Sequence, residues 1–219
     1  GFPSPDSDYD LRGCHVMPLD QVIGLRELSQ TAERLGDEQG LELDLVSHDV
    51  KKFCRLLVRS DGPALEQLCS PWVLRTSSWH EELIALAPGL LTTNAGHHYA
   101  GFARARWRAF EAQPRVKTLL YVYRALLTGL HVVRARAVEA HLPTLLEHYP
   151  QPGVEALVEQ KRSGAEKQPL PIESVDQHRV AYERLLDELE AARTDSDLPA
   201  EAPAFSAVDD WLRRVRLQF

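Results

Sequence analysis

The sequence predicts an α+β protein, with a small mixed β-sheet near the N-terminus followed by a C-terminal helical bundle. Two short runs rich in Val and Leu, residues 9–18 and 41–47, have the apolar pattern of strands. Beyond Pro71, apolar residues recur at helical spacing almost to the end of the chain. With 44% apolar residues in 219, the chain can bury one sizeable core or two small ones. We expect a sheet domain at residues 1–75 and a helical domain at residues 76–219.

A helix should follow the second strand directly. Four apolar residues fall at helical spacing after Asp49, which is placed for the first turn: Val50, Phe53, Cys54 and Leu57. We expect this helix to run to about Arg59 and to end at the turn sequence SDGP. Residues 21–28 are a weaker candidate for a further strand.

Further helices are expected in the C-terminal two-thirds of the chain. The breaks between them are rich in Gly, Pro and polar residues, as in KRSGAEKQPLP and TDSDLPAEAP. The predicted helical segments are residues 79–87, 97–112, 115–136, 138–148, 153–162, 174–193 and 207–217.

Charge is unevenly distributed along the chain. The first 50 residues carry eleven Asp and Glu against three Arg, whereas residues 97–136 carry eight Lys and Arg against one Glu. The formal net charge of -7 argues against a protein that coats nucleic acid over a long footprint. An acidic segment next to a basic one suits a ligand that brings both cations and phosphates, such as a nucleotide.

The cysteines and the apolar runs indicate a cytoplasmic location without membrane contact. Cys14, Cys54 and Cys69 are an odd number without CxxC spacing, which argues against a disulfide framework or a zinc site. No uninterrupted apolar run approaches the roughly 18 residues of a spanning helix. The start of the sequence lacks the basic and then apolar pattern of a signal peptide.

Three aspartates, Asp6, Asp8 and Asp10, alternate near the N-terminus. An EF-hand calcium loop is excluded, because its sixth and twelfth positions need Gly and Glu, and here they are Leu11 and Met17. A solvated turn suits Asp6, which lies between Pro5 and Ser7, but it does not suit the two aspartates that enter a strand.

Asp8 and Asp10 instead have the spacing of a metal site. Residues two apart on a strand point to the same face, roughly 6.6 Å apart, so two carboxylates can converge on a hard cation such as Mg²⁺ or Mn²⁺. A third acid commonly comes from a neighbouring strand, and Asp44 is the candidate because its charge within an apolar strand needs compensation. Asp49 is the alternative, although an acid at a helix N-terminus explains it equally well.

Five segments resemble the nucleotidyltransferases of the DNA polymerase beta superfamily, in the bacterial branch associated with RNA repair: SDYDLRG, LDLVSHDVKKF, LEQLCSP, YAGFA and KTLLYVYR. The resemblance covers most of residues 1–136. It implies that residues 1–75 are a catalytic core in which Asp8, Asp10 and Asp44 bind magnesium. It also implies a phosphate-binding Gly-Ser element before the aspartate pair, which we expect to precede Gly1. The branch often has His at the position of Tyr121.

The basic segments supply candidate phosphate ligands. Lys117, Tyr121, Arg124 and His131 share one face of a helix by their spacing. We expect Arg124 to be partly buried in this apolar segment and therefore to need an anionic partner, which a triphosphate would provide. Lys52, which matches a Lys-Phe pair of the branch, could also reach the phosphates, and we expect Tyr99 at the start of a helix near the nucleotide. The alternating residues Arg104, Arg106 and Arg108 form either an electropositive surface for RNA or a merely solvated one.

Two functions follow from these observations. The first is a metal-dependent nucleotidyltransferase that moves a nucleoside monophosphate from a nucleoside triphosphate to a hydroxyl acceptor, with RNA or tRNA as a partner. The second is a catalytically inactive module of the same fold that binds a nucleotide or RNA. Three carboxylates favour the enzyme, because a pure binder has no need for the third.

Overall fold

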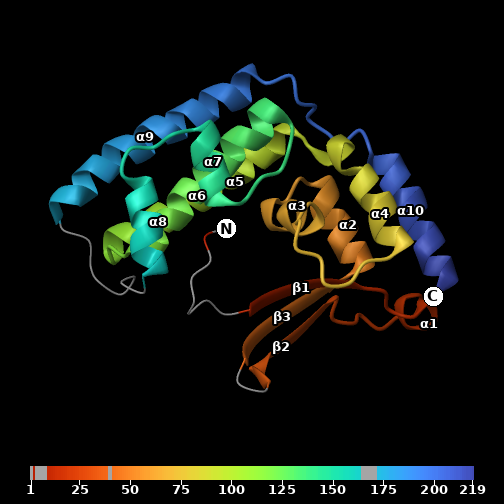
Figure 1. The fold of residues 1–219 in the computed structure, drawn as a ribbon. Coiled ribbons are helices and arrows are strands. Elements are labelled where there is room, and N and C mark those ends of the chain that lie inside the picture. Colours follow the sequence, from red (N-terminus) through yellow and green to blue (C-terminus); the bar gives the residue numbers. More distant parts are fainter. Residues whose placement is uncertain (1, 3–8, 39–40, 164–171) are drawn as a thin grey trace. The chain divides into compact units, whose positions relative to one another are not determined.

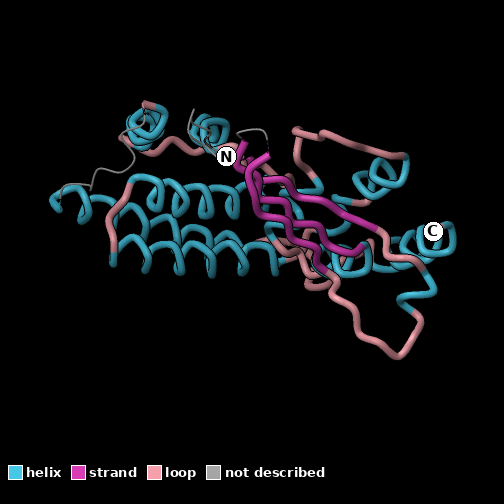
Figure 2. Tube along the Cα trace, turned by 90° about the horizontal axis from the view of Figure 1, so that it is seen from below, coloured by secondary structure: helices cyan, strands magenta, loops and turns pink. Residues whose placement is uncertain are grey.

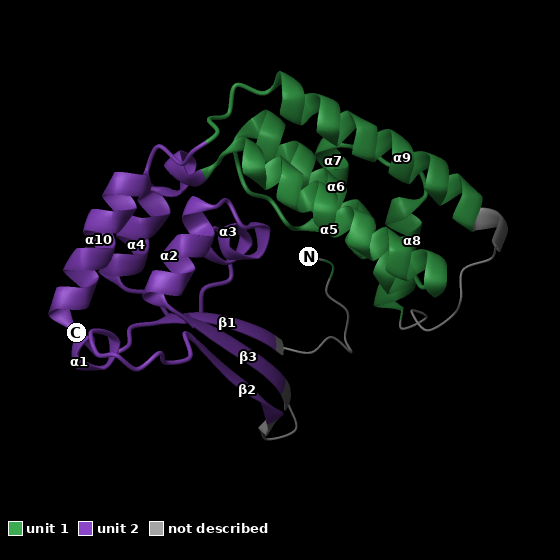
Figure 3. Ribbon diagram, turned by 180° about the vertical axis from the view of Figure 1, so that it is seen from behind, with its two compact units in different colours: residues 1–7, 91–200 green, residues 8–90, 201–219 purple. Residues whose placement is uncertain are grey.

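The computed structural model describes residue 2 and residues 9–38, 41–163 and 172–219, and it confirms the α+β class. A three-stranded sheet is followed by helices that make up most of the remaining chain (Figure 1). The chain forms two compact units (Figure 3). Residues 8–90 and 201–219 make up the sheet unit, and residues 1–7 and 91–200 make up the helical unit.

The sheet is mixed and has the strand order β1-β3-β2 (Figure 1), and its strands lie side by side in Figure 2. β1 (Tyr9–His15) runs parallel to the central strand β3 (Leu41–Asp49), and β2 (Thr31–Glu38) runs antiparallel to it. β1 and β3 confirm the strands expected at residues 9–18 and 41–47. The pairing register places Asp10 opposite Asp44.

The third strand is β2, so our assignment of a strand to residues 21–28 is wrong. That stretch begins in the short helix α1 (Leu19–Val22) and continues as bends. Ile23 is 74% exposed and Leu25 is fully exposed, so these apolar residues have no core to join. β2 was missed because its sequence, TAERLGDE, has no apolar run; it forms an edge strand whose residues 32–36 are exposed.

Helix α2 (Val50–Val58) confirms the helix predicted after the second strand, and it buries the four expected residues. Asp49 caps it, since its carboxylate accepts a hydrogen bond from the backbone N–H of Lys51 at 3.0 Å. Helix α3 (Gly62–Leu68) was not predicted. It begins at the Asp61 cap within the SDGP sequence that ends α2, so a single polar turn both ends one helix and starts the next.

The remaining helices of the sheet unit are α4 (Ser78–Ala85), the 3₁₀ turn η1 (Ala87–Leu90) and α10 (Phe205–Gln218). α10 packs against α2 and α4. The Trp211 ring meets the Trp79 ring edge to face at 6.2 Å, and its Nε1–H donates to the Trp79 carbonyl at 3.2 Å. Residues from the end of the chain therefore complete the core of the sheet unit.

Among its described residues, the helical unit contains the helices α5 (Thr93–Ala112), α6 (Val116–Ala135), α7 (Leu142–His148), α8 (Val154–Arg162) and α9 (Ile172–Asp195). They confirm the helical segments predicted between residues 97 and 193. The compact units do not follow one break along the chain, because α4, η1 and α10 belong to the sheet unit. The domain boundary at residue 75 stays a prediction.

Helix α6 is the core of the helical unit and packs against α5, α7, α8 and α9. It is long and apolar enough to cross a membrane by length and composition alone, but 72% of its apolar window is buried inside the structure. Burial among neighbouring helices accounts for its apolar character.

Candidate functional site

Asp10 and Asp44 face each other across the pair of strands β1 and β3. Residues in register on adjacent strands direct their side chains to the same face of a sheet. Both side chains are accessible, Asp10 at 64% and Asp44 at 36% exposure. Asp8, the third predicted ligand, lies outside the described residues. Two of the three predicted carboxylates are thus on one face of the sheet unit.

Arg12 lies between these two carboxylates. Its Nη2 donates to Asp10 Oδ1 at 2.9 Å and to Asp44 Oδ2 at 3.0 Å. Its Nη1 donates to the backbone carbonyls of Asp44 at 2.9 Å and Leu11 at 3.0 Å. The sequence interpretation did not assign Arg12 to the site. Its position two residues after Asp10 on a strand was the available signal, because that spacing puts it on the same face.

The donor set of the carboxylate pair fits a hard cation. Carboxylate oxygens suit Mg²⁺ and Mn²⁺ better than softer metals, and Mg²⁺ commonly takes one or two carboxylates with water and substrate phosphate as further ligands. Within the described ranges, no three His, Cys, Asp or Glu side chains cluster as a metal site. A complete site would need Asp8 or substrate oxygens beside Asp10 and Asp44.

Lys52, a predicted phosphate ligand, lies near the end of β3. Its Nζ donates a hydrogen bond to Thr31 Oγ1 at 2.5 Å. Because Thr31 Oγ1 is the acceptor in that bond, its own hydroxyl proton can be donated to His48 Nδ1, which lies 3.1 Å away. Burial, together with the Lys52 charge, lowers the pKa of His48 and so favours the neutral ring that can accept this proton. His48 lies on the same face of β3 as Asp44, four residues further along and therefore about 13 Å away.

Asp49, the alternative ligand, is engaged in structural contacts. Among the strand residues whose side chains are described, it alone is buried. Its carboxylate accepts hydrogen bonds from the N–H groups of Lys51 at 3.0 Å and Met17 at 3.2 Å, and from Arg216 Nη2 at 2.5 Å. Burial alone would raise the pKa of Asp49, but the hydrogen bonds from Arg216, Met17 and Lys51 outweigh burial and lower it. The helix-cap interpretation explains the Lys51 contact, whereas the Met17 and Arg216 contacts are tertiary.

The predicted cationic residues of α6 belong to the helical unit. Lys117 is exposed, and Tyr121 and Arg124 are partly exposed, on a helix most of whose residues are buried. The guanidinium carbon of Arg106 on α5 lies 5.4 Å from the centre of the Tyr121 ring, and that of Arg124 lies 5.6 Å from it. Phe2 meets the same ring edge to face at 5.0 Å. The partly exposed Tyr121 ring thus lies close to two cationic side chains of this unit.

Tyr99 is only 2% exposed, and α6 approaches it closely at Gly129. Its side chain has almost no surface for a ligand and contributes to the core of the helical unit. Of the three alternating arginines on α5, expected to form either an electropositive surface or a solvated one, Arg104 pairs with Glu190 on α9 at 2.8 Å. Arg106 lies over aromatic rings, at 4.8 Å from the Phe102 ring centre. These two arginines therefore have different partners.

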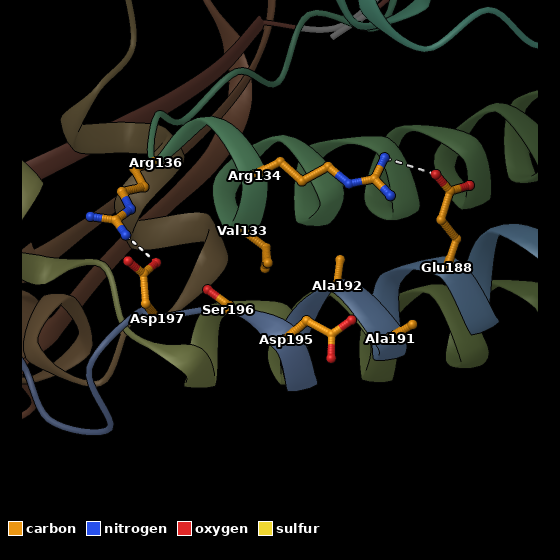
Figure 4. Close-up of a pocket in the computed structure, with 9 residues that line it drawn as sticks. All are labelled: Val133, Arg134, Arg136, Glu188, Ala191, Ala192, Asp195, Ser196 and Asp197. Carbon is orange, nitrogen blue, oxygen red and sulfur yellow. Dashed lines mark hydrogen bonds and ion pairs between the residues drawn. The ribbon is translucent and has the colours of Figure 1, made fainter.

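A hollow of about 460 Å³ lies in the helical unit, between the C-terminal parts of α6 and α9 (Figure 4). An ion pair lies at each of its two ends. Arg134 pairs with Glu188 at 2.8 Å, and Arg136 pairs with Asp197. None of its described lining residues is a predicted site residue. Its arginines are already neutralised by acids, so the hollow supplies no separate anion site.

Comparisons with known proteins agree with the resemblance in the sequence. The model of the family described as RlaP, RNA repair pathway DNA polymerase beta family, matches residues 1–214. MJ0002, an uncharacterized protein of Methanocaldococcus jannaschii, is 30% identical over 132 residues, which are 59% of this chain and 54% of that protein. YcgL, an uncharacterized protein of Bacillus subtilis, is 27% identical over 176 residues, which are 76% of this chain and 66% of that protein.

The chain spans 54% and 66% of the lengths of these two curated relatives. No solved structure matches it. The family match covers the sheet that carries Asp10 and Asp44 and nearly all of the helices. The chain therefore belongs to the RNA repair pathway DNA polymerase beta family and is a polymerase-beta-like protein of the nucleotidyltransferase type.

Proposed function

We propose that the protein is a metal-dependent enzyme that transfers a nucleoside monophosphate from a nucleoside triphosphate to a hydroxyl and releases pyrophosphate. The observation that carries this proposal is the register of Asp10 and Asp44 on β1 and β3, with both side chains accessible on one face. Two like charges that face each other repel, and a cation between them compensates the repulsion. In the structure, the Arg12 guanidinium provides this positive charge; in the enzyme that we propose, a divalent cation provides it.

In this proposal, Asp8, Asp10 and Asp44 hold Mg²⁺ or Mn²⁺. When bound, the metal supplies positive charge that stabilises the reacting phosphate and lowers the pKa of the attacking hydroxyl. Asp44 is the nearest candidate general base for that hydroxyl, because one of its oxygens can accept a proton while the other is a ligand. Asp49 is left out of the site because its contacts hold α2 and α10.

Cationic side chains would bind the phosphate groups. Lys52 needs only to leave Thr31 to become available, and an ammonium on a flexible stem can do so at little cost. On the helical unit, the exposed Lys117 and the partly exposed Arg124 are candidates for phosphate contacts. We propose a cytoplasmic RNA end, including tRNA, as the hydroxyl acceptor, which is the class that the family description suggests.

The test is a transfer assay on the full-length protein. Each labelled nucleoside triphosphate is incubated with Mg²⁺ or Mn²⁺ and with RNA ends, proteins or small-molecule hydroxyls as acceptors. We expect label on RNA, pyrophosphate release, and a loss of at least about 10²-fold in Asp44→Asn. Glu27→Gln, which removes an exposed acid elsewhere in the sheet unit, is the matched control and should keep full activity.

Binding of nucleotide without transfer to any acceptor would contradict the enzyme and leave the alternative, an inactive module that binds a nucleotide or RNA. Transfer to proteins or small molecules would keep the reaction and replace the acceptor. Full activity in Asp44→Asn would remove the carboxylate pair from the chemistry.

A further inference from the structure

The contacts of Arg12 are unusual for a surface arginine on a strand. Instead of extending into solvent, its side chain bends back toward Asp10 and across to β3. One nitrogen, Nη2, contacts carboxylate oxygens of two different strands, at 2.9 Å from Asp10 and 3.0 Å from Asp44. The other, Nη1, is fixed by two backbone carbonyls. A single positive charge thus bridges the two acids that oppose each other across the sheet.

This position is the one that a divalent cation would need in order to bridge the same two oxygens. A guanidinium and a metal ion cannot occupy it together, since both are positive and their separation would be only a few ångströms. The side chains are partly exposed, 39% for Arg12, 64% for Asp10 and 36% for Asp44. Ion pairs this accessible contribute little to stability, so the bridge can open at small cost.

The ion pair between Arg216 and Asp49 provides the contrast within the same unit. The Arg216 side chain is 10% exposed and the Asp49 side chain is 1% exposed, and the Asp49 carboxylate also accepts two hydrogen bonds from backbone N–H groups. A pair buried in this way holds its geometry, because breaking it leaves an uncompensated charge in the protein. Arg12 has the surroundings of a replaceable counter-ion, whereas Arg216 has those of a permanent one.

We propose that Arg12 is the counter-ion of the carboxylate pair in the metal-free protein, and that cation binding displaces its guanidinium, which then binds a phosphate oxygen of the triphosphate. The inference rests on the proposed function, because it requires Asp10 and Asp44 to be cation ligands. A guanidinium is suited to the exchange, since its planar donors match both carboxylate and phosphate oxygens. Metal affinity and phosphate affinity should therefore change in opposite directions when Arg12 is removed.

The first measurement is calorimetric titration of the full-length protein with Mn²⁺ alone. Arg12→Gln should bind Mn²⁺ about 3- to 10-fold more tightly than wild type, because the competing cation is gone. Arg26→Gln is the matched control for the change in net charge, since Arg26 is exposed in the loop between β1 and β2. It should bind Mn²⁺ as wild type does.

The second measurement is titration with tripolyphosphate in saturating Mn²⁺, a probe that carries no base. Arg12→Gln should bind it at least about 10-fold more weakly, and Arg12→Lys should recover part of the loss, because an ammonium keeps the charge without the planar fork. Unchanged tripolyphosphate affinity in Arg12→Gln would overturn the phosphate role.

Unchanged or weaker Mn²⁺ binding by Arg12→Gln, with normal binding by wild type, would overturn the counter-ion role and leave the proposed metal site standing. Asp44→Asn separates the two ideas. If wild type and Asp44→Asn bind Mn²⁺ equally, the proposed metal site is wrong, and the role of Arg12 is overturned with it.

Discussion

Two aspartates five residues apart on β3 differ in their surroundings. The Asp44 side chain is 36% exposed and pairs with a partly exposed arginine. The Asp49 side chain is 1% exposed and accepts hydrogen bonds from two backbone N–H groups and a buried arginine. The same residue type on the same strand is thus accessible at one position and structural at the other. This contrast gives a pair of matched substitutions.

Asp49→Asn should destabilise the protein by about 3–5 kcal/mol, because it leaves the Arg216 guanidinium buried without a counter-charge. Asp44→Asn should cost less than about 1 kcal/mol, since its ion pair is accessible to water. Urea unfolding at pH 7 measures both. Equal effects of the two substitutions would show that burial does not distinguish these aspartates.

The stability that Asp49 contributes should depend on pH in a defined direction. The hydrogen bonds to Asp49 lower its pKa below the ordinary value of 3.8, so the contribution is complete above that value and is lost as the pH falls through the lower pKa of the folded state. In urea unfolding, the difference between wild type and Asp49→Asn should stay constant down to about pH 5 and narrow below pH 4. A difference that persists undiminished at about pH 2 would contradict the lowered pKa.

At the residue scale, the sequence predicted the carboxylate pair but missed its partner. Alternation of Asp8 and Asp10 and the isolation of Asp44 among apolar residues selected three acids, of which Asp10 and Asp44 lie in register in the structure. Arg12 was missed because a charged residue two positions along a strand has many possible partners. Its contact with Asp44 depends on the register of β1 and β3, which the local pattern does not contain.

At the element scale, the strength of the apolar pattern decided which predictions were confirmed. The sequence predicted α2 and the long helices of the helical unit, because burial of one face of a helix spaces its apolar residues at the helical period. β2 was missed and residues 21–28 were misassigned for one shared reason. An edge strand can be polar, and a surface loop can carry exposed apolar residues such as Ile23 and Leu25, so composition misleads at both places.

Close packing of α5 against α6 predicts opposite effects at two helical glycines. A Cβ on Gly129 would lie 2.8 Å from the Tyr99 Cβ and 3.0 Å from Leu189 Cδ2, whereas nothing lies within 4 Å of one on Gly101. Gly101→Ala should stabilise the protein by about 0.5–1 kcal/mol through helix propensity. Gly129→Ala should destabilise it by about 1–2 kcal/mol in spite of that gain, because of overpacking. If the melting temperature rises in both variants or falls in both, the result would contradict this contact between helices.

The exposed face of α6 should bind phosphate groups. Lys117→Ala and Arg124→Ala should each weaken tripolyphosphate binding several-fold, because each removes a cation from that face. Arg115→Ala, at the exposed N-terminal cap of the same helix, is the control and should have no effect. Melting temperatures should stay within a few degrees of wild type. Unfolding of the variants would instead indicate that these side chains are structural.

At the scale of the whole molecule, the chain returns to the sheet unit with its last helix, α10. α10 packs on α2 and α4, and Arg216 binds both Asp49 and the carbonyl of Met17, at 2.7 Å for the latter. The sequence predicted α10 as a helix but not its place in the sheet unit, because a helical period says which face is buried and not which partner buries it. The two compact units are therefore a property of the folded structure that the local patterns did not give.

The central claim is that Asp10 and Asp44 hold a divalent cation. Its most direct test is an anomalous difference map from crystals of the full-length protein grown with Mn²⁺ and tripolyphosphate. We expect a peak on the face of β1 and β3, about 2.1 Å from a carboxylate oxygen of each aspartate, with the Arg12 guanidinium displaced from both. A map without a peak there, in which Arg12 still bridges Asp10 and Asp44, would contradict the claim.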